Sequence, residues 1–111
     1  MADFYLKRGD TSPSLEATLT EFDGTDDVAI DLTGASVVFS MTTMGGTVIV
    51  SRKSVAIVTA LNGQVRYDWE SGDTAMPGTF KAEFEVTLPS GKIVSFPNTE
   101  SIVIKILEDL A

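Results

Sequence analysis

Carboxylates are the side chains of this sequence best suited to chemistry, and they crowd residues 21–27, with Asp31 shortly after. Several oxygens on one short segment are what a calcium site needs. If Asp23 were the first position of an EF-hand loop, the sixth would be Gly and the twelfth Glu. Those positions hold Val28 and Gly34, so the pattern fails at both. The spacing therefore favours a solvated, mobile acidic loop, and we predict no metal site.

A second carboxylate pair, Glu83 and Glu85, shares one face of an alternating segment, and paired carboxylates can hydrolyse glycosides. Phe80 and Phe84 occupy the other face, so the pair is expected on the wet face, with no cleft to raise a pKa. The chain has no His and no Cys, which excludes thiolate metal sites, Cys nucleophiles and Ser-His or Cys-His relays. We therefore predict no enzymatic activity, no catalytic residue and no cofactor.

Two aromatic residues, Tyr67 and Trp69, fall on the same face as Val65 and could form a platform on which a sugar stacks. A carbohydrate-binding or adhesin module is therefore the alternative function. The lone Trp of a small β-sandwich is usually part of its core, and we favour that interpretation.

The tripeptide Arg8-Gly9-Asp10 has the composition of a cell-adhesion motif, but it lies between two strand patterns. Gly relaxes the φ angle, Asp caps a turn, and Pro13 blocks pairing at the edge of the next strand. We interpret the tripeptide as the corner between the first two strands.

Length and composition predict that all of these residues belong to one domain. A chain of 111 residues, 43% of them hydrophobic, suits a single compact domain over residues 1–111. The net charge of −8 repels phosphate backbones and anionic lipid, so neither nucleic acid nor a membrane is an expected partner. The sequence shows neither an apolar signal segment nor a stretch long enough to span a bilayer, which predicts synthesis in the cytoplasm.

The elements that position these residues are predicted to be strands, because apolar and polar residues alternate with a period of two. Turn residues punctuate the pattern, and Asn62-Gly63 suits a tight hairpin. Residues 70–75 are expected to form a helical turn, and the tail of 102–111 could coil into another. The pattern predicts an all-β, antiparallel β-sandwich of about seven to nine strands, with a small barrel as the alternative. The predicted strands are 14–20, 37–41, 65–69, 80–86, 4–7, 30–32, 48–50, 55–61, 93–96 and 101–106.

The order of several segments also carries a family resemblance. The segments are residues 4–13 running into the strand at 15–19, then 30–37, 63–69, 72–74, 78–86 and 96–98. Together they cover nearly the whole chain, and their order resembles the N-terminal immunoglobulin-like domain of phage baseplate upper proteins and related small tail proteins. The resemblance implies an immunoglobulin-like β-sandwich that docks onto a phage tail or baseplate.

From this resemblance we expect a non-enzymatic virion component, made in the host cytoplasm. Its expected partners are other tail or baseplate proteins, with self-association as an option. The larger relatives continue into segments that carry the receptor-binding protein, whereas this chain stops at Ala111, which favours a stand-alone tail, neck or baseplate piece. The expected partner contacts are Phe4, Tyr5, Phe96, Pro97 and Asn98.

Overall fold

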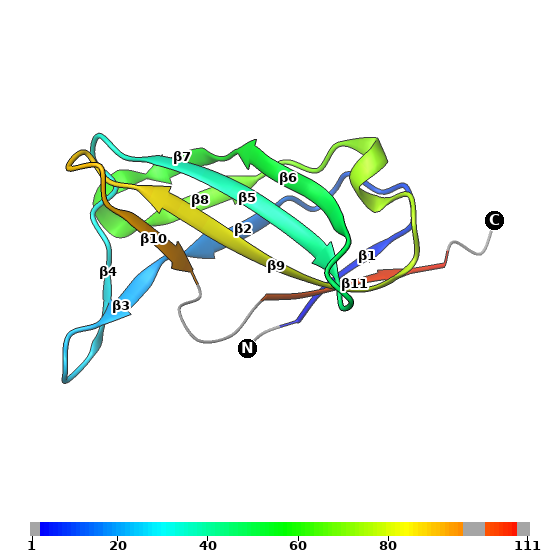
Figure 1. The fold of residues 1–111 in the computed structure, drawn as a ribbon, viewed down its shortest axis with the longest axis horizontal. Coiled ribbons are helices and arrows are strands. Elements are labelled where there is room, and N and C mark those ends of the chain that lie inside the picture. The colour runs from blue at the N-terminus through cyan, green and yellow to red at the C-terminus, as the bar shows by residue number, and fades with distance from the viewer. Residues whose placement is uncertain (1–2, 97–101, 109–111) are drawn as a thin grey trace.

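The computed structural model describes residues 3–96 and 102–108, which fold into two β-sheets packed face to face (Figure 1). The larger sheet has the strand order β1-β11-β9-β5-β6, with β10 beside β9. Its strands are β1 (Asp3–Lys7), β5 (Ser36–Thr43), β6 (Val48–Ser54), β9 (Gly78–Thr87), β10 (Ile93–Phe96) and β11 (Ile102–Leu107). The smaller sheet, in the order β2-β8-β7, contains β2 (Leu15–Thr18), β7 (Ala56–Thr59) and β8 (Gln64–Tyr67).

The prediction of an all-β sandwich is confirmed. The sequence did not predict that the strands β3 (Thr20–Phe22) and β4 (Asp27–Ala29) form a hairpin of their own, nor the short 3-10 helix η1 (Ala60–Asn62) after β7. A second 3-10 helix, η2 (Ser71–Thr74), follows β8. β1 pairs with β11 in parallel. The described residues contain eleven strand segments, because Leu19 separates β2 from β3 and Val55 separates β6 from β7.

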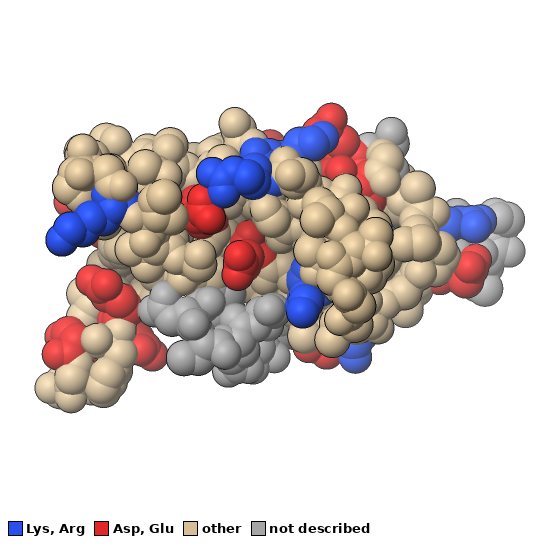
Figure 2. Space-filling view, viewed as in Figure 1, with Lys and Arg blue, Asp and Glu red and all other residues tan. Residues whose placement is uncertain are grey.

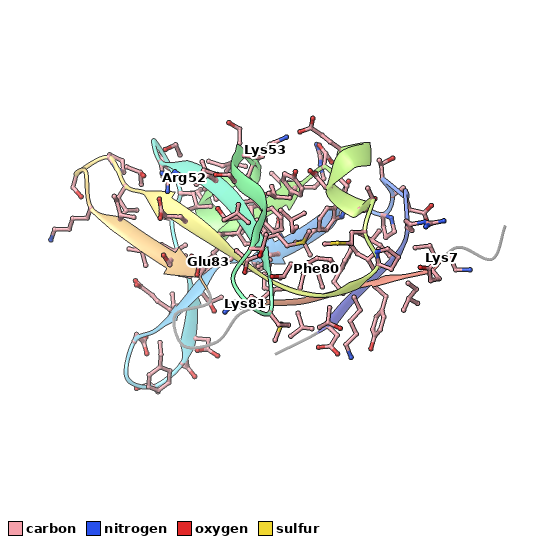
Figure 3. The ribbon with its side chains drawn as sticks, turned by 45° about the vertical axis from the view of Figure 1, so that its right-hand side comes forward. Lys7, Arg52, Lys53, Phe80, Lys81 and Glu83 are labelled. Carbon is pink, nitrogen blue, oxygen red and sulfur yellow. The ribbon has the colours of Figure 1, made fainter. Side chains whose placement is uncertain are left out.

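Alternation decides which side chains enter the core. On β9, Phe80, Phe84 and the residues that alternate with them are buried, whereas Lys81 and Glu83 are exposed, as Figure 3 lets the reader follow along the strand. Opposite them on β5, Phe39 pairs with Phe84 in the strand register. The continuous core consists of Leu6, Leu15, Leu19, Ile30, Leu32, Val37, Phe39, Met41, Val50, Val65, Tyr67, Trp69, Phe80, Ala82, Phe84, Val86, Phe96, Ile104 and Ile106.

Two local predictions are wrong. Residues 30–32 are not a strand: Ile30 and Leu32 are buried, but their amides donate separately to the carbonyls of Leu19 and Ala60, both at 2.9 Å, outside any regular ladder. The Asn62-Gly63 turn is longer than a two-residue hairpin, because η1 precedes Gly63, whose φ is +65°. The strand predicted at 101–106 is present as β11, which pairs with both β9 and β1, so residues 102–107 do not coil; residues 109–111 of the tail lie outside the described residues.

The corner at residues 8–13 joins β1 to β2 as predicted. The Gly9 amide donates to the Thr74 carbonyl at 3.0 Å, and the Thr74 hydroxyl donates to the Asp10 carbonyl at 2.9 Å. Gly9 adopts a φ of +84°, which favours glycine, and the Ser12-Pro13 peptide bond is cis. The expected helical turn at residues 70–75 is present as η2. The adhesion-like tripeptide is therefore tied to η2 by two hydrogen bonds to Thr74, one from the Gly9 amide and one from the Thr74 hydroxyl.

Candidate functional site

The acidic segment, which was predicted to be a solvated loop, forms a projecting hairpin. Phe22 pairs with Asp27, and Glu21 pairs with Val28, so the two strands enclose a turn at residues 23–26. The hairpin extends from one end of the sandwich in Figure 1, and its acidic side chains stand out at the lower left of Figure 2. Phe22 is 67% exposed and Val28 is 45% exposed. The segment thus presents apolar and acidic side chains together.

One carboxylate of this segment has a structural role. Asp23 Oδ1 accepts hydrogen bonds from the amides of Thr25 at 2.9 Å and Asp26 at 2.8 Å, and the Asp23 amide donates to the Asp26 carbonyl at 3.0 Å. The hydrogen bonds from Asp26 and Thr25 lower the pKa of Asp23. Asp31 likewise accepts hydrogen bonds from the Thr33 hydroxyl and the Thr33 amide. Both hydrogen bonds lower the pKa of Asp31, and the one from the hydroxyl has the larger effect. Both carboxylates hold turns. Within residues 3–96 and 102–108, no three Asp or Glu side chains gather into a metal-binding group.

The carboxylate pair on β9 lies on the outer face of the larger sheet, as the alternation predicted. The Arg52 Nη1 atom reaches across β5 to Glu85 Oε1 at 2.5 Å, while Glu83 is exposed. Arg52 itself has a φ of +48°, at an irregular stretch of the β5–β6 pairing, where its amide donates to Ser40 Oγ at 3.1 Å. The ion pair stabilises the sheet. Glu83 and Glu85 therefore do not form a pair of carboxylates arranged for acid–base catalysis.

The two aromatic residues considered for sugar stacking are in the core. Tyr67 is 2% exposed and Trp69 is 4% exposed, and the Phe39 ring lies 4.3 Å from Tyr67 and 5.6 Å from Trp69 between centroids. Neither ring is available to a sugar face. The favoured core interpretation is confirmed, and the alternative carbohydrate-binding function loses the residues on which it depended.

A buried polar network joins Tyr67 to η2. The Tyr67 hydroxyl and the Glu70 amide both donate to Asp73 Oδ2, at 2.5 Å and 2.9 Å. Burial, followed by the hydrogen bond to Asp73, raises the pKa of Tyr67. Lys53 Nζ lies 2.6 Å from Glu70 Oε1, and this hydrogen bond raises the pKa of Lys53. Asp73 is 6% exposed, and through these hydrogen bonds it anchors the end of β8.

The three expected partner contacts that the structure describes differ in burial. Tyr5 is 54% exposed on the outer face, with Lys105 Nζ 5.6 Å from its ring centroid, whereas Phe4 is half-buried and stacks on Trp69 at 6.0 Å. Phe96 is 3% exposed and faces Phe84. The other two expected contacts, Pro97 and Asn98, lie outside the described residues.

Sequence reasoning missed the hairpin and the role of Asp73. The hairpin was hidden because only three residues on each side pair, too few for alternation to register. Asp73 had a usable signal: Glu70 and Asp73 have the spacing of a capping box, and the Glu70 amide donates to Asp73 Oδ2 at 2.9 Å.

A shallow depression crosses the outer face of the smaller sheet. Its lining contains one titratable residue, Glu16, among the residues that the structure describes, with Thr18, Val58 and Gln64 as its other main walls. Nothing in this lining assembles a nucleophile with a base. No helix in the described part of the chain is long and apolar enough to cross a membrane.

The protein is a β-sandwich domain, and the polar side chains described above stabilise its turns and pair across the outer faces of its sheets. The model of the BppU N-terminal domain matches residues 2–109, and the chain belongs to this family of phage baseplate upper protein domains. The family resemblance inferred from the order of the sequence segments is therefore confirmed.

Solved structures agree on the fold. The chain is similar to the N-terminal domain of ORF48 of phage TP901-1, with 16% identity and a TM-score of 0.60, over 97% of this chain and 85% of that one. It is also similar to CopC from Methylosinus trichosporium OB3b, with 11% identity and a TM-score of 0.56, over 100% of this chain and 89% of that one. At these identities the likeness concerns the fold alone. No protein in the curated sequence comparison matches the chain.

Proposed function

We propose that this protein is a non-enzymatic structural component of a phage tail or baseplate, which docks onto neighbouring tail proteins in the virion. The observation that carries the proposal is the match of the baseplate family model to residues 2–109, nearly the whole chain. The fold of the phage TP901-1 domain supports the same role.

The chemistry of the described surface supports a binding role over a catalytic one. None of the carboxylates singled out from the sequence is placed for catalysis. Asp23 stabilises a turn, Glu85 forms an ion pair with Arg52, and Glu83 is exposed on a sheet face. A domain of this kind contributes shape, charge and sheet edges to an assembly. Of the contacts expected from the sequence, Tyr5 has the exposure that docking needs, whereas the burial of Phe96 favours a role in the core.

The proposal is tested by locating the protein in purified particles. Gradient-purified virions should contain it at a fixed number of copies per particle by quantitative mass spectrometry, and antibody labelling should place it on the tail. A phage protein made in infection but not packaged serves as the control for contamination. If the protein is no more abundant in particles than this control, the proposed function is wrong.

A further inference from the structure

We propose that the β3–β4 hairpin is a docking arm whose Phe22 side chain enters an apolar pocket, rimmed by Lys or Arg side chains, on a neighbouring protein of the particle. The inference rests on the proposed function, because it takes the partner to be another tail or baseplate protein. It adds which surface docks and what chemistry the partner presents.

The first step of the argument is the exposure of Phe22 on an element that projects. β3 and β4 pair with each other and with no other strand of the described chain, and Phe22 is 67% exposed on them. Aromatic side chains are enriched at the energetic centres of protein interfaces because they bury a large area at a low cost in conformational freedom. Leu61 and Ile93 are exposed to a similar degree, but they lie against the body of the sandwich, on η1 and β10. Phe22 is the exposed aromatic residue that a partner can enclose from several sides.

The second step is that the tip is already ordered. The Asp23 carboxylate accepts from the amides of Thr25 and Asp26, which fixes the turn that connects the two strands. A binding element that is held in one conformation loses less conformational entropy when it docks. The hairpin can therefore present Phe22 without a folding step.

The third step is charge, which identifies the partner. Phe22 lies directly opposite Asp27, and Val28 lies directly opposite Glu21, so each face of the hairpin combines an apolar side chain with a carboxylate. The ion pairs formed among the described residues involve other parts of the fold, namely β1, β6, β8, β9, β11 and residues that flank them. A pocket with a basic rim would complement these carboxylates, and complementary charge gives specificity and speeds encounter. The net charge of −8 opposes a second copy of this chain as the occupant.

The test uses a phage that lacks the gene, with the protein supplied in trans. Phe22→Ala should lower the number of copies per particle at least tenfold, and Glu21→Lys combined with Asp27→Lys should do the same. Val58→Ala is the matched control, because Val58 is 52% exposed on β7, at an edge of the smaller sheet. Thermal unfolding of each purified variant shows that the loss of packaging is not a loss of folding. Packaging of Phe22→Ala at the wild-type level, or an equal loss for Val58→Ala, overturns the inference.

Cross-linking in the assembled particle gives an independent result. A photoreactive amino acid at position 22 should cross-link to a tail or baseplate protein, next to Lys or Arg residues, whereas the same amino acid at position 58 should not. Cross-links from position 58 without any from position 22 overturn the inference, and the proposed function survives because the protein is still in the particle. If the wild-type protein is absent from particles, both proposals fail.

Discussion

Phe39 and Phe22 belong to the same chain and to the same kind of element, yet their surroundings are opposite. Phe39 lies on a central strand, is 0% exposed, and packs 4.3 Å from Tyr67 and 5.3 Å from Phe84 between ring centroids. Phe22 lies on a hairpin that pairs only with itself and is 67% exposed. Phe39 lies on β5, which is paired on both sides and faces the second sheet, whereas Phe22 lies on β3, which pairs only with β4. The sandwich body maintains the fold, whereas the hairpin presents side chains outward.

The strongest way to break this comparison is to remove each ring. Phe39→Ala should lower the free energy of unfolding by about 3 to 5 kcal/mol, because it leaves a cavity between the sheets. Phe22→Ala should change it by less than about 0.5 kcal/mol, since its ring is mostly in water. Urea unfolding at constant m-value measures both. Equal losses would show that the hairpin is part of the cooperative core.

Glycine substitutions compare the same two regions through the backbone. A Cβ on Gly63 would lie 2.6 Å from the Leu19 carbonyl oxygen and 2.9 Å from that of Ile30, at a φ of +65°. We expect Gly63→Ala to cost about 2 kcal/mol or more, since both the φ angle and two backbone atoms oppose it. Gly24 in the hairpin turn has a φ of +103° with nothing within 4 Å, so Gly24→Ala should cost only about 1 kcal/mol. Thermal unfolding of the two variants gives the order, and a larger loss for Gly24→Ala would contradict it.

Alkaline pH should destabilise the sandwich body through Tyr67 and should leave the hairpin unaffected. The pKa of Tyr67 is raised in the fold above its ordinary value of 10.0, by burial and then by the hydrogen bond to Asp73. The folded state therefore holds this proton more tightly than the unfolded state. The stabilisation is complete below about pH 10 and is lost above it, at up to about 1.4 kcal/mol per pH unit.

Urea midpoints between pH 8 and pH 11 measure this loss. Tyr67→Phe should flatten the decline above pH 10, at a cost of about 1 kcal/mol at neutral pH for the hydrogen bond. Tyr5→Phe is the control, because it leaves the Tyr67 hydroxyl in place, and the decline should persist. A decline of the same steepness in Tyr67→Phe would assign the effect to other groups.

In the hairpin the expected effect is local. Asp23→Ala removes the acceptor of two turn amides, so hydrogen exchange at Thr25 and Asp26 should become severalfold faster while global stability stays the same. Asp23→Asn keeps an acceptor oxygen and should retain most of the protection. Because the pKa of Asp23 is lowered, the ionised form stabilises the turn above about pH 3.8, and this contribution is lost as the pH falls through the lowered value. Exchange that is the same in Asp23→Ala would mean that the strands alone hold the turn.

The smallest expected effect is at the corner between β1 and β2. The Asp10 backbone makes the contacts with Lys7 and Thr74, and its side chain is exposed, so Asp10→Glu should change the free energy of unfolding by less than about 0.5 kcal/mol. Binding to purified integrin should be absent in both forms. Integrin binding by the native protein that disappears in Asp10→Glu would restore the adhesion interpretation.

The sequence predicted burial better than pairing. The alternation around Phe84 identified the core face correctly, because a period of two is a local property of the chain. Ile30 and Leu32 are buried as apolar residues should be, but their amides bond to two different segments, Leu19 and Ala60, and no local pattern records that. The parallel pairing of β1 with β11 joins residues about a hundred positions apart, from Asp3 with Val103 to Lys7 with Leu107, and is likewise beyond local reasoning.

The candidate site was harder to predict for the same reason. The acidic run was visible in the sequence, but its use as a hairpin depends on three cross-strand pairs and on the Asp23 turn. Phe96 and Tyr5 looked alike as aromatic residues near the two ends of the chain. Only the sheet registers show that Phe96 faces Phe84 in the core, whereas Tyr5 faces Lys105 on the outside.

The parallel edge has a mechanical consequence. β1 and β11, the first and last strands of the described chain, lie side by side and run in the same direction through five register pairs. A force that pulls the start of β1 away from the end of β11 acts along the strands, so it loads the evenly spaced hydrogen bonds of the pair in shear and all together. An antiparallel hairpin pulled from its open end would instead unzip one bond at a time. The domain is thus built to transmit tension between these two strands without peeling open.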